Sequence, residues 1–133
     1  MSVEGHNHSW AIQAGGDLSD LRPGTGAIFK AVALDTGTIA SNGRQAGGIL
    51  LYGGKSGEPV SLGTWGVMKF TAGAPVAKGR RLTVTQSGYF SEAASGSYVV
   101  GRCLDADVGS GGVGTGLFNF ATTAYMGHIG ELA

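Results

Sequence analysis

Three cations stand close together in the sequence, and they are the side chains best suited to binding a charged partner. Lys78, Arg80 and Arg81 lie within one four-residue segment. Ammonium and guanidinium groups bind carboxylates and phosphates through charge-assisted hydrogen bonds. If a strand begins at Arg80, side-chain alternation places Arg80 and Arg81 on opposite faces, so that at most one shares a face with Lys78. Two interpretations stay open: a solvated strand entry, or a contact with an acidic protein surface.

Two glycine-rich segments have some features of nucleotide-binding motifs without meeting their requirements. Gly109–Gly114 has the G-x-G-x-x-G spacing, but that motif needs a following helix, and the next residues are typical of a strand. Gly48–Ser56 has five residues between Gly48 and Gly54, where a phosphate-binding loop needs four. We predict a loop at the first segment and a hairpin turn at the second.

Metal ligands and catalytic groups are scarce. His6 and His8 would share one side of an extended segment, but a third ligand is missing and His128 is distant in sequence. Asp105 and Asp107 begin like a calcium loop, yet the glutamate expected at its last position is a glycine. A looser calcium site stays open as an alternative. No serine–histidine–aspartate set and no carboxylate pair is recognisable, so we predict no metal, no cofactor and no enzymatic activity.

The composition excludes several classes of protein. Glycine accounts for 26 of 133 residues without a collagen period, and 42% of the residues are hydrophobic, too many for a disordered chain. Nine Lys and Arg balance nine Asp and Glu, so no overall field favours nucleic acid or an anionic membrane. Charged residues make up only 14%, against about 25% in a typical domain. The deficit indicates surface covered by other protein, as in a homo-oligomer; solvation by Ser and Thr is the alternative.

Cys103 is the only cysteine, so a disulfide within the chain is excluded. Its apolar neighbours indicate a buried thiol that acts as a small hydrophobic side chain. No apolar run approaches the roughly 18 residues of a membrane span, and Met1–His8 lacks the apolar region of a signal peptide. We expect a protein made in the cytoplasm that binds no membrane.

Short alternating segments between turn residues predict an all-β chain. Leu82 and Val84 alternate with polar residues, as in a strand with one wet face, and no segment has convincing helical periodicity. The strand candidates are 26–34, 48–52, 60–71, 80–85, 98–104 and 116–124. We expect two segments to contribute to one core, with alternation turning some side chains of each outward: Trp65, Val67, Met68 and Phe70 from the first, and Leu117, Phe118 and Phe120 from the second.

Residues 1–25 are expected to form an extended arm, and residues 26–133 a single β domain. Ser9–Gln13 favours one strand, and Asp17–Arg22 one helical turn. Trp10, with Ile12, would anchor the arm through its large contact area. Because the arm cannot make a core of its own, we expect it to lie along a neighbouring subunit or partner, with Ser9–Gln13 as an added edge strand.

A weak internal repeat has an offset of 50 residues. Residues 31–70 align with 81–120, so that Gly66–Phe70 meets Gly116–Phe120 and Ile49-Leu50 meets Val99-Val100. Two copies of such a unit would close into a small Gly-rich β-barrel or β-sandwich and hide most strand edges. The alternative is that any two glycine-rich β segments align this well.

The segment from Gly66 to Phe120 resembles the small capsid decoration, or cement, proteins of tailed bacteriophages. The resemblance lies in a strand followed by Ala72–Gly79, a second strand, Val99–Gly101, Cys103-Leu104, a glycine-rich loop and a last hydrophobic strand. It implies a β-barrel-like core and a structural protein of the virion. Such a protein is made in the host cytoplasm, binds the major capsid protein on the outer capsid surface, and stabilises the shell by bridging capsid subunits.

The resemblance and the composition together favour a homotrimer that binds neither nucleic acid nor membrane. The residues expected at the capsid or subunit interface are Trp10, Ile12, Lys78, Arg80 and Arg81. The alternative is a carbohydrate- or host-surface-binding β module, such as a head fibre or adhesin. Tyr52, Trp65 and Tyr89 would then form an exposed aromatic platform.

Overall fold

The computed structural model of the chain describes residues 7–22, 26–33, 35–40, 46–94, 98–120 and 124–125. These residues form strands and turns, with one short 3₁₀ turn at Gln86–Gly88, and the predicted all-β class is confirmed. The strands are β1 (Asn7–Gln13), β2 (Ala31–Ala33), β3 (Ala46–Tyr52), β4 (Pro59–Thr71), β5 (Arg81–Val84), β6 (Phe90–Glu92), β7 (Tyr98–Val99), β8 (Gly101–Cys103), β9 (Val113–Asn119) and β10 (Ala124–Tyr125).

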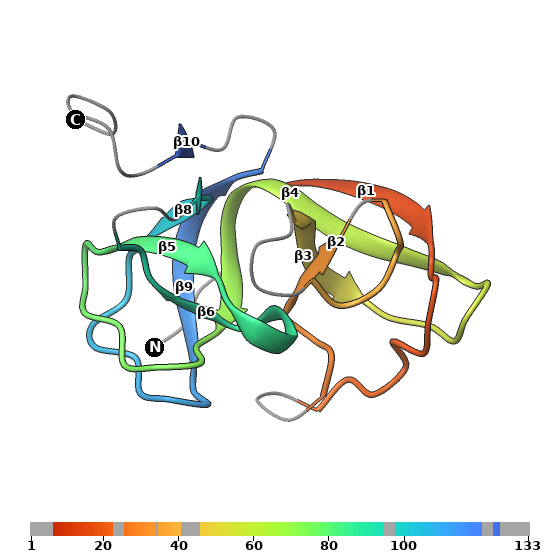
Figure 1. Cartoon of the computed structure of the whole chain (residues 1–133), viewed down its shortest axis with the longest axis horizontal. Coiled ribbons are helices and arrows are strands. Elements are labelled where there is room, and N and C mark those ends of the chain that lie inside the picture. Colours follow the sequence, from red (N-terminus) through yellow and green to blue (C-terminus); the bar gives the residue numbers. More distant parts are fainter. Residues whose placement is uncertain are drawn as a thin grey trace.

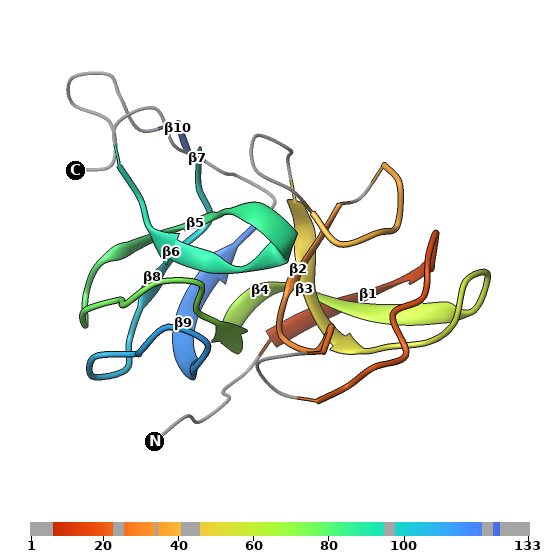
Figure 2. The same ribbon diagram turned by 60° about the horizontal axis from the view of Figure 1, so that its bottom comes forward.

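The long strand β4 joins two lobes, as Figures 1 and 2 show. β1 pairs with one edge of β4 from Pro59 to Gly66, while the other edge pairs first with β3 and then, from Trp65 onward, with β9. We call the part with β1, β2 and β3 the N-terminal lobe, and the part with β5, β6, β8 and β9 the C-terminal lobe. β4 changes partner near Gly66, whose φ of 117° is a conformation that favours glycine.

The main sheet is antiparallel and curls into a barrel-like shape. Its strand order is β2-β3-β4-β9-β8-β5-β6, with β1 on the remaining edge of β4, and β7 pairs separately with β10. Within the order, β2-β3-β4 and β5-β8-β9 are each an antiparallel set of three neighbours. These two sets lie in the two halves of the predicted repeat and share their strand order, but their registers differ: Ala31 pairs with Ile49, whereas Arg81 pairs with Arg102 and not with Val99, the repeat equivalent of Ile49. The resulting curvature leaves an inner face that must be filled by apolar side chains.

The larger of two hydrophobic clusters fills the C-terminal lobe and reaches β2 and β3. Phe70, Phe90 and Phe118 meet edge to face at centroid distances of 5.4–5.8 Å, and Phe120 stacks on Phe118 at 5.7 Å. Edge-to-face packing brings a positive ring edge to a negative face, which stabilises aromatic pairs by about 0.5–1.5 kcal/mol beyond burial. Of the seven expected core positions, four are buried (Met68, Phe70, Phe118 and Phe120), Val67 is half-buried, and Trp65 and Leu117 face outward.

A smaller cluster fills the N-terminal lobe and includes residues from the predicted arm. Ala14 and Leu18 are buried with Leu50, Val60 and Leu62. Ile12 packs against the same cluster, opposite Val60 across β1 and β4. The strand predicted at Ser9–Gln13 is present, but it adds to its own chain's β4 instead of to a neighbour. The expectation that the arm needs another molecule was wrong, because β1 pairs with a free edge of β4 and Leu18 is buried in the smaller cluster.

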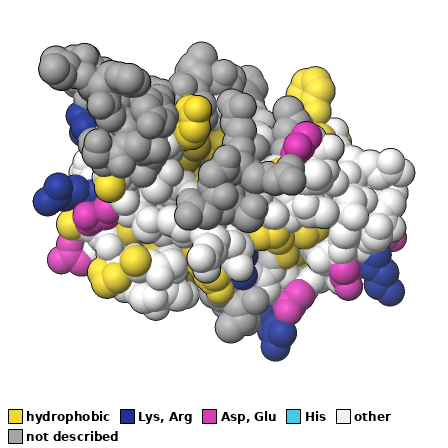
Figure 3. Space-filling model, in the orientation of Figure 1, with side chains coloured by type: hydrophobic (Ala, Val, Ile, Leu, Met, Phe, Trp, Pro, Cys, Tyr) yellow, Lys and Arg dark blue, Asp and Glu magenta, His cyan; other side chains and the backbone are white. Residues whose placement is uncertain are grey.

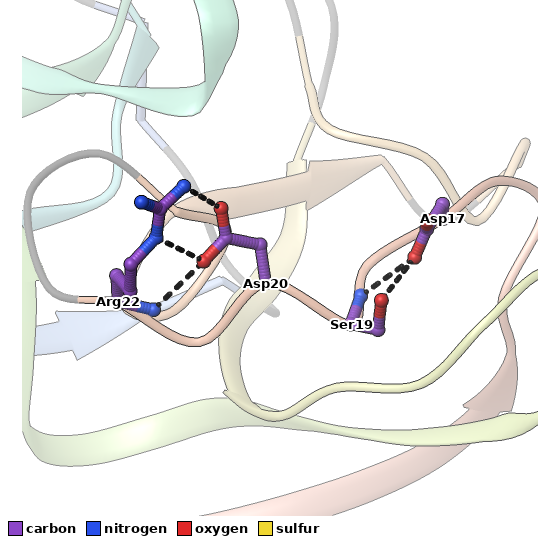
Figure 4. Close-up of polar contacts among 4 residues, drawn as sticks. All are labelled: Asp17, Ser19, Asp20 and Arg22. Carbon is purple, nitrogen blue, oxygen red and sulfur yellow. Dashed lines mark hydrogen bonds and ion pairs between the residues drawn. The ribbon is translucent and has the colours of Figure 1, made fainter.

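Residues 17–22 form two side-chain-stabilised turns rather than the predicted helical turn (Figure 4). The carboxylate of Asp17 accepts hydrogen bonds from the backbone N–H and hydroxyl of Ser19, and that of Asp20 accepts from the backbone and guanidinium of Arg22. Short Asp side chains compete in this way with helical hydrogen bonds. The Arg22 guanidinium, followed by the Arg22 backbone N–H, lowers the pKa of Asp20 to about 2.

No helix in the described part of the chain is long and apolar enough to cross a membrane.

Candidate functional site: an arginine-lined hollow

The turn before β5 brings the predicted basic segment against β8. Gly79, with φ of 83°, donates its N–H to the carbonyl oxygen of Cys103 at 2.8 Å, and Cys103 donates back to Arg80 at 2.8 Å. The positive φ is readily adopted only by glycine, so Gly79 permits the chain to reverse here. This paired contact fixes Arg80 beside β8 although it lies outside the strand.

Arg81 begins β5 and lies directly opposite Arg102 of β8. Residues opposite each other on antiparallel strands present their side chains to the same face, with Cβ atoms about 4.5–5.5 Å apart. Arg80, Arg81 and Arg102 thus line one hollow of about 260 Å³, together with Gly79, Glu92 and Ala93. The prediction that Arg80 and Arg81 face opposite ways required a strand that begins at Arg80; β5 begins at Arg81, so the alternation does not apply to Arg80.

Glu92 supplies the acidic group among the residues that line the hollow. One oxygen of its carboxylate, Oε2, accepts a hydrogen bond from the backbone N–H of Ala77 at 2.9 Å. Three arginines and one glutamate thus line the hollow, so that its lining has a net positive charge. Planar guanidinium groups can bind a carboxylate in a bidentate manner.

The other residues predicted for the interface lie elsewhere. Lys78 is exposed in the turn and does not line the hollow. Trp10 lies in β1 of the N-terminal lobe with 64% of its side chain exposed, while Ile12 is half-buried against the smaller cluster. The structure therefore brings Arg80 and Arg81 together, and keeps Trp10 and Ile12 apart from them.

Arg102 is the member of the hollow that the sequence did not reveal. It stands between Gly101 and Cys103 in a correctly predicted strand region, so alternation indicates that it faces opposite to the buried Cys103. Its nearness to Arg81 depends on the pairing of β5 with β8 and on the register of that pair, since the internal repeat would place Val99 opposite Arg81.

The aromatic platform considered as an alternative is only partly present. Tyr52 and Trp65 are 66% and 49% exposed. Tyr89, by contrast, is half-buried, and the ammonium of Lys30 lies 4.3 Å from its ring centroid. This cation–π contact occupies a face of the Tyr89 ring that a sugar would need.

The surface shows few charges, as the composition implies. On the face in Figure 3, Lys, Arg, Asp and Glu side chains lie mainly around the margin, including a mixed group over the C-terminal lobe at the left.

The described residues include no group of three or more His, Cys, Asp or Glu side chains placed to hold a metal ion. His6 and His128 lie outside the described residues. Gly109–Gly114 is followed by the strand β9, and a dinucleotide-binding motif would require a helix at this place.

Cys103 is buried, as predicted, with 1% of its surface exposed. Its thiol donates a weak hydrogen bond to the carbonyl oxygen of Asp105 at 3.4 Å. Burial raises the pKa of this thiol, and the carboxylates of Asp105 and Asp107 contribute in the same direction. The thiol therefore stays protonated at neutral pH, a state with little nucleophilic reactivity.

The fold is shared with a solved phage protein. The structure is similar to that of the N base of the head fibre gp8.5 of bacteriophage phi29, with a TM-score of 0.65 and 14% sequence identity. The similarity covers 92% of this chain and 100% of that one. No protein-family model and no curated protein sequence matches the chain. At this level of identity the likeness shows the fold: a β architecture that also serves as the base of a head fibre.

Proposed function

We propose that this chain is a non-enzymatic structural protein of a bacteriophage head that binds the outer surface of the capsid. The observation that carries the proposal is a structural likeness over 92% of the chain to the base of a head fibre. The phage resemblance in Gly66–Phe120 supports it independently, because it rests on the sequence. The protein is made in the host cytoplasm and joins the virion.

In its more specific form, the proposal is a decoration protein that bridges neighbouring subunits of the major capsid protein. Bridging stabilises a shell because each bound copy adds contacts that must break together, which raises the effective affinity. A low fraction of charged residues, 14%, and the arginine-lined hollow fit a protein with much of its surface against other protein. No nucleic acid or membrane partner is part of the proposal.

The base of a head fibre is the second candidate, and the structural likeness to the phi29 protein favours it. A fibre base also binds the capsid, but it projects a further domain or partner instead of cementing the shell. The two candidates share attachment to the head and differ in what attachment does to the shell.

Purified virions of the phage that encodes the chain provide the test. We expect the protein to co-purify with intact heads at a fixed copy number per shell. Heads that lack it should rupture at lower temperature if it is a decoration protein, and at unchanged temperature if it is a fibre base. Absence from washed heads would contradict both candidates.

A further inference from the structure

The arginine-lined hollow continues into a row of apolar side chains on the same outer face of the sheet. Arg102 lies directly opposite Leu117 of β9, and Leu117 lies opposite Val67 of β4. With Arg81 opposite Arg102, one row crosses β5, β8, β9 and β4. Neighbouring strands are about 4.8 Å apart, so Leu117 lies about 5 Å from Arg102 and Val67 about 10 Å.

The apolar end of this row is open to solvent. Leu117 is 51% exposed and Val67 is half-buried. Trp65, two residues before Val67 on β4, is 49% exposed. Large apolar side chains that lie together on one face, beside polar groups, are typical of protein interaction sites.

The cationic end has an electrostatic conflict that a bound anion would relieve. Arg81 and Arg102 carry like charges directly opposite each other, an arrangement that destabilises a strand pair. Among the described residues, the side chains of Arg80 and Arg102 have no hydrogen bond or ion pair. A like-charge pair that lowers the stability of the domain is expected at a binding site, because the bound partner compensates for the repulsion.

We propose that this surface, formed by the hollow together with Leu117, Val67 and Trp65, docks an acidic segment of a protein partner on the phage head. A partner carboxylate enters the hollow between Arg80 and Arg102, and an apolar side chain of the same segment covers Leu117 and Val67. An extended segment advances about 3.3 Å per residue, so the apolar residue stands two or three positions from the acidic one. The assignment rests on the proposed function for the identity of the partner.

The surface fits a protein segment better than a nucleic acid. Because Glu92 also lines the hollow, a single carboxylate bound by Arg80 and Arg102 meets less repulsion there than a chain of phosphates would. The chain as a whole has a formal net charge of zero, so it lacks the field that draws polyanions. A phosphate backbone would bury little of the apolar surface of Leu117 and Val67.

Binding to heads that lack the protein tests this assignment with neutralising variants. We expect Arg80→Gln, Arg102→Gln and Leu117→Ser each to weaken head binding about tenfold or more. Lys55→Gln removes an exposed cation from the N-terminal lobe and should bind like the wild type. Arg102→Gln should also unfold at the same or a higher temperature, because it removes the like-charge pair. Unchanged head binding by both arginine variants would overturn the assignment, whereas a wild type that binds no heads would contradict the proposed function instead.

An NMR titration of the purified protein tests, without phage heads, which kind of ligand this surface binds. The probes are the peptide acetyl-Glu-Glu-Ala-Leu-amide, its Gln-Gln counterpart and a short DNA duplex. At millimolar peptide we expect the acidic peptide to shift the amide signals of Arg102 and Leu117, and the Gln-Gln peptide to leave them in place. No shift at these amides, equal shifts with both peptides, or a stronger response to the duplex would each overturn the assignment.

Discussion

At the residue scale, neighbouring positions in one strand have opposite surroundings. Phe118 is 1% exposed and contacts Phe70 and Phe90, whereas Leu117 is half exposed on the outer face. Gly116 and Gly101 leave the space that the Phe118 ring fills, since a Cβ at Gly116 would come within 2.6 Å of that ring. Alternation along β9 thus places Phe118 in the core, where it stabilises the fold, and the adjacent Leu117 on the outer face, where it is available for binding.

This separation makes a paired prediction. Phe118→Ala should lower the free energy of unfolding by about 3–5 kcal/mol, because it removes a buried ring and leaves a cavity among three other rings. Leu117→Ala should change it by no more than about 0.5 kcal/mol, since Leu117 is half exposed on the outer face and its removal leaves no enclosed cavity. Urea denaturation of both variants gives the comparison. Equal losses in the two variants would contradict the placement of the two side chains on opposite faces of β9, and a larger loss in Leu117→Ala would show that β9 has the opposite orientation.

The acidic turn near the N-terminus predicts a specific dependence on pH. Because the pKa of Asp20 is lowered to about 2, the folded state favours its ionised form. The resulting stabilisation is present above the ordinary Asp pKa of about 3.9 and is lost as the pH falls toward 2. NMR titration of the Asp20 carboxyl in wild type and Arg22→Gln measures it. The variant should titrate nearer the ordinary value, and an unchanged titration would assign the shift to another cause.

At the element scale, β1 shows where prediction from the sequence ends. The strand itself was predictable, because Ser9–Gln13 has β-forming residues between turn residues. Its partner was not, because pairing with β4 depends on which edge the rest of the sheet leaves open. The same limit applies to Arg102: its face follows from alternation, but its position beside Arg81 follows from strand order. Alternation within a strand determines which face of the sheet a side chain occupies, whereas pairing between strands distant in sequence determines which residues lie beside it.

Removal of β1 should therefore destabilise the domain. A chain that begins at Gly16 loses every backbone pair between β1 and β4 and uncovers Val60 and Leu62 of the smaller cluster. We expect its midpoint of urea denaturation to fall clearly below that of a chain that begins at Asn7 and keeps the strand. Unchanged denaturation would mean that β1 contributes no stability to its own chain, and would restore the view of an arm available to a neighbour.

At the scale of the whole molecule, the two lobes offer different surfaces. The C-terminal lobe carries the arginine-lined hollow and its apolar row, whereas the N-terminal lobe exposes Trp10 and Tyr52. We propose that the C-terminal surface binds the capsid and that Trp10 of the N-terminal lobe contacts a different surface of a neighbouring copy. Head-to-tail contacts between unlike surfaces close into rings when the rotation permits, and a trimer is the ring we propose.

Sedimentation equilibrium tests self-association directly. Across micromolar concentrations we expect a species of three times the 13.4 kDa chain mass, because the chain has few charges to keep copies apart. Trp10→Ser should shift the equilibrium toward monomer without lowering the unfolding temperature, since Trp10 is mostly in solvent within its own chain. Leu21→Ser is the matched control, an exposed apolar side chain of the same lobe that should leave association unchanged. A wild type that sediments as a monomer at every concentration contradicts the trimer, and disruption by both variants alike would remove Trp10 as its specific contact.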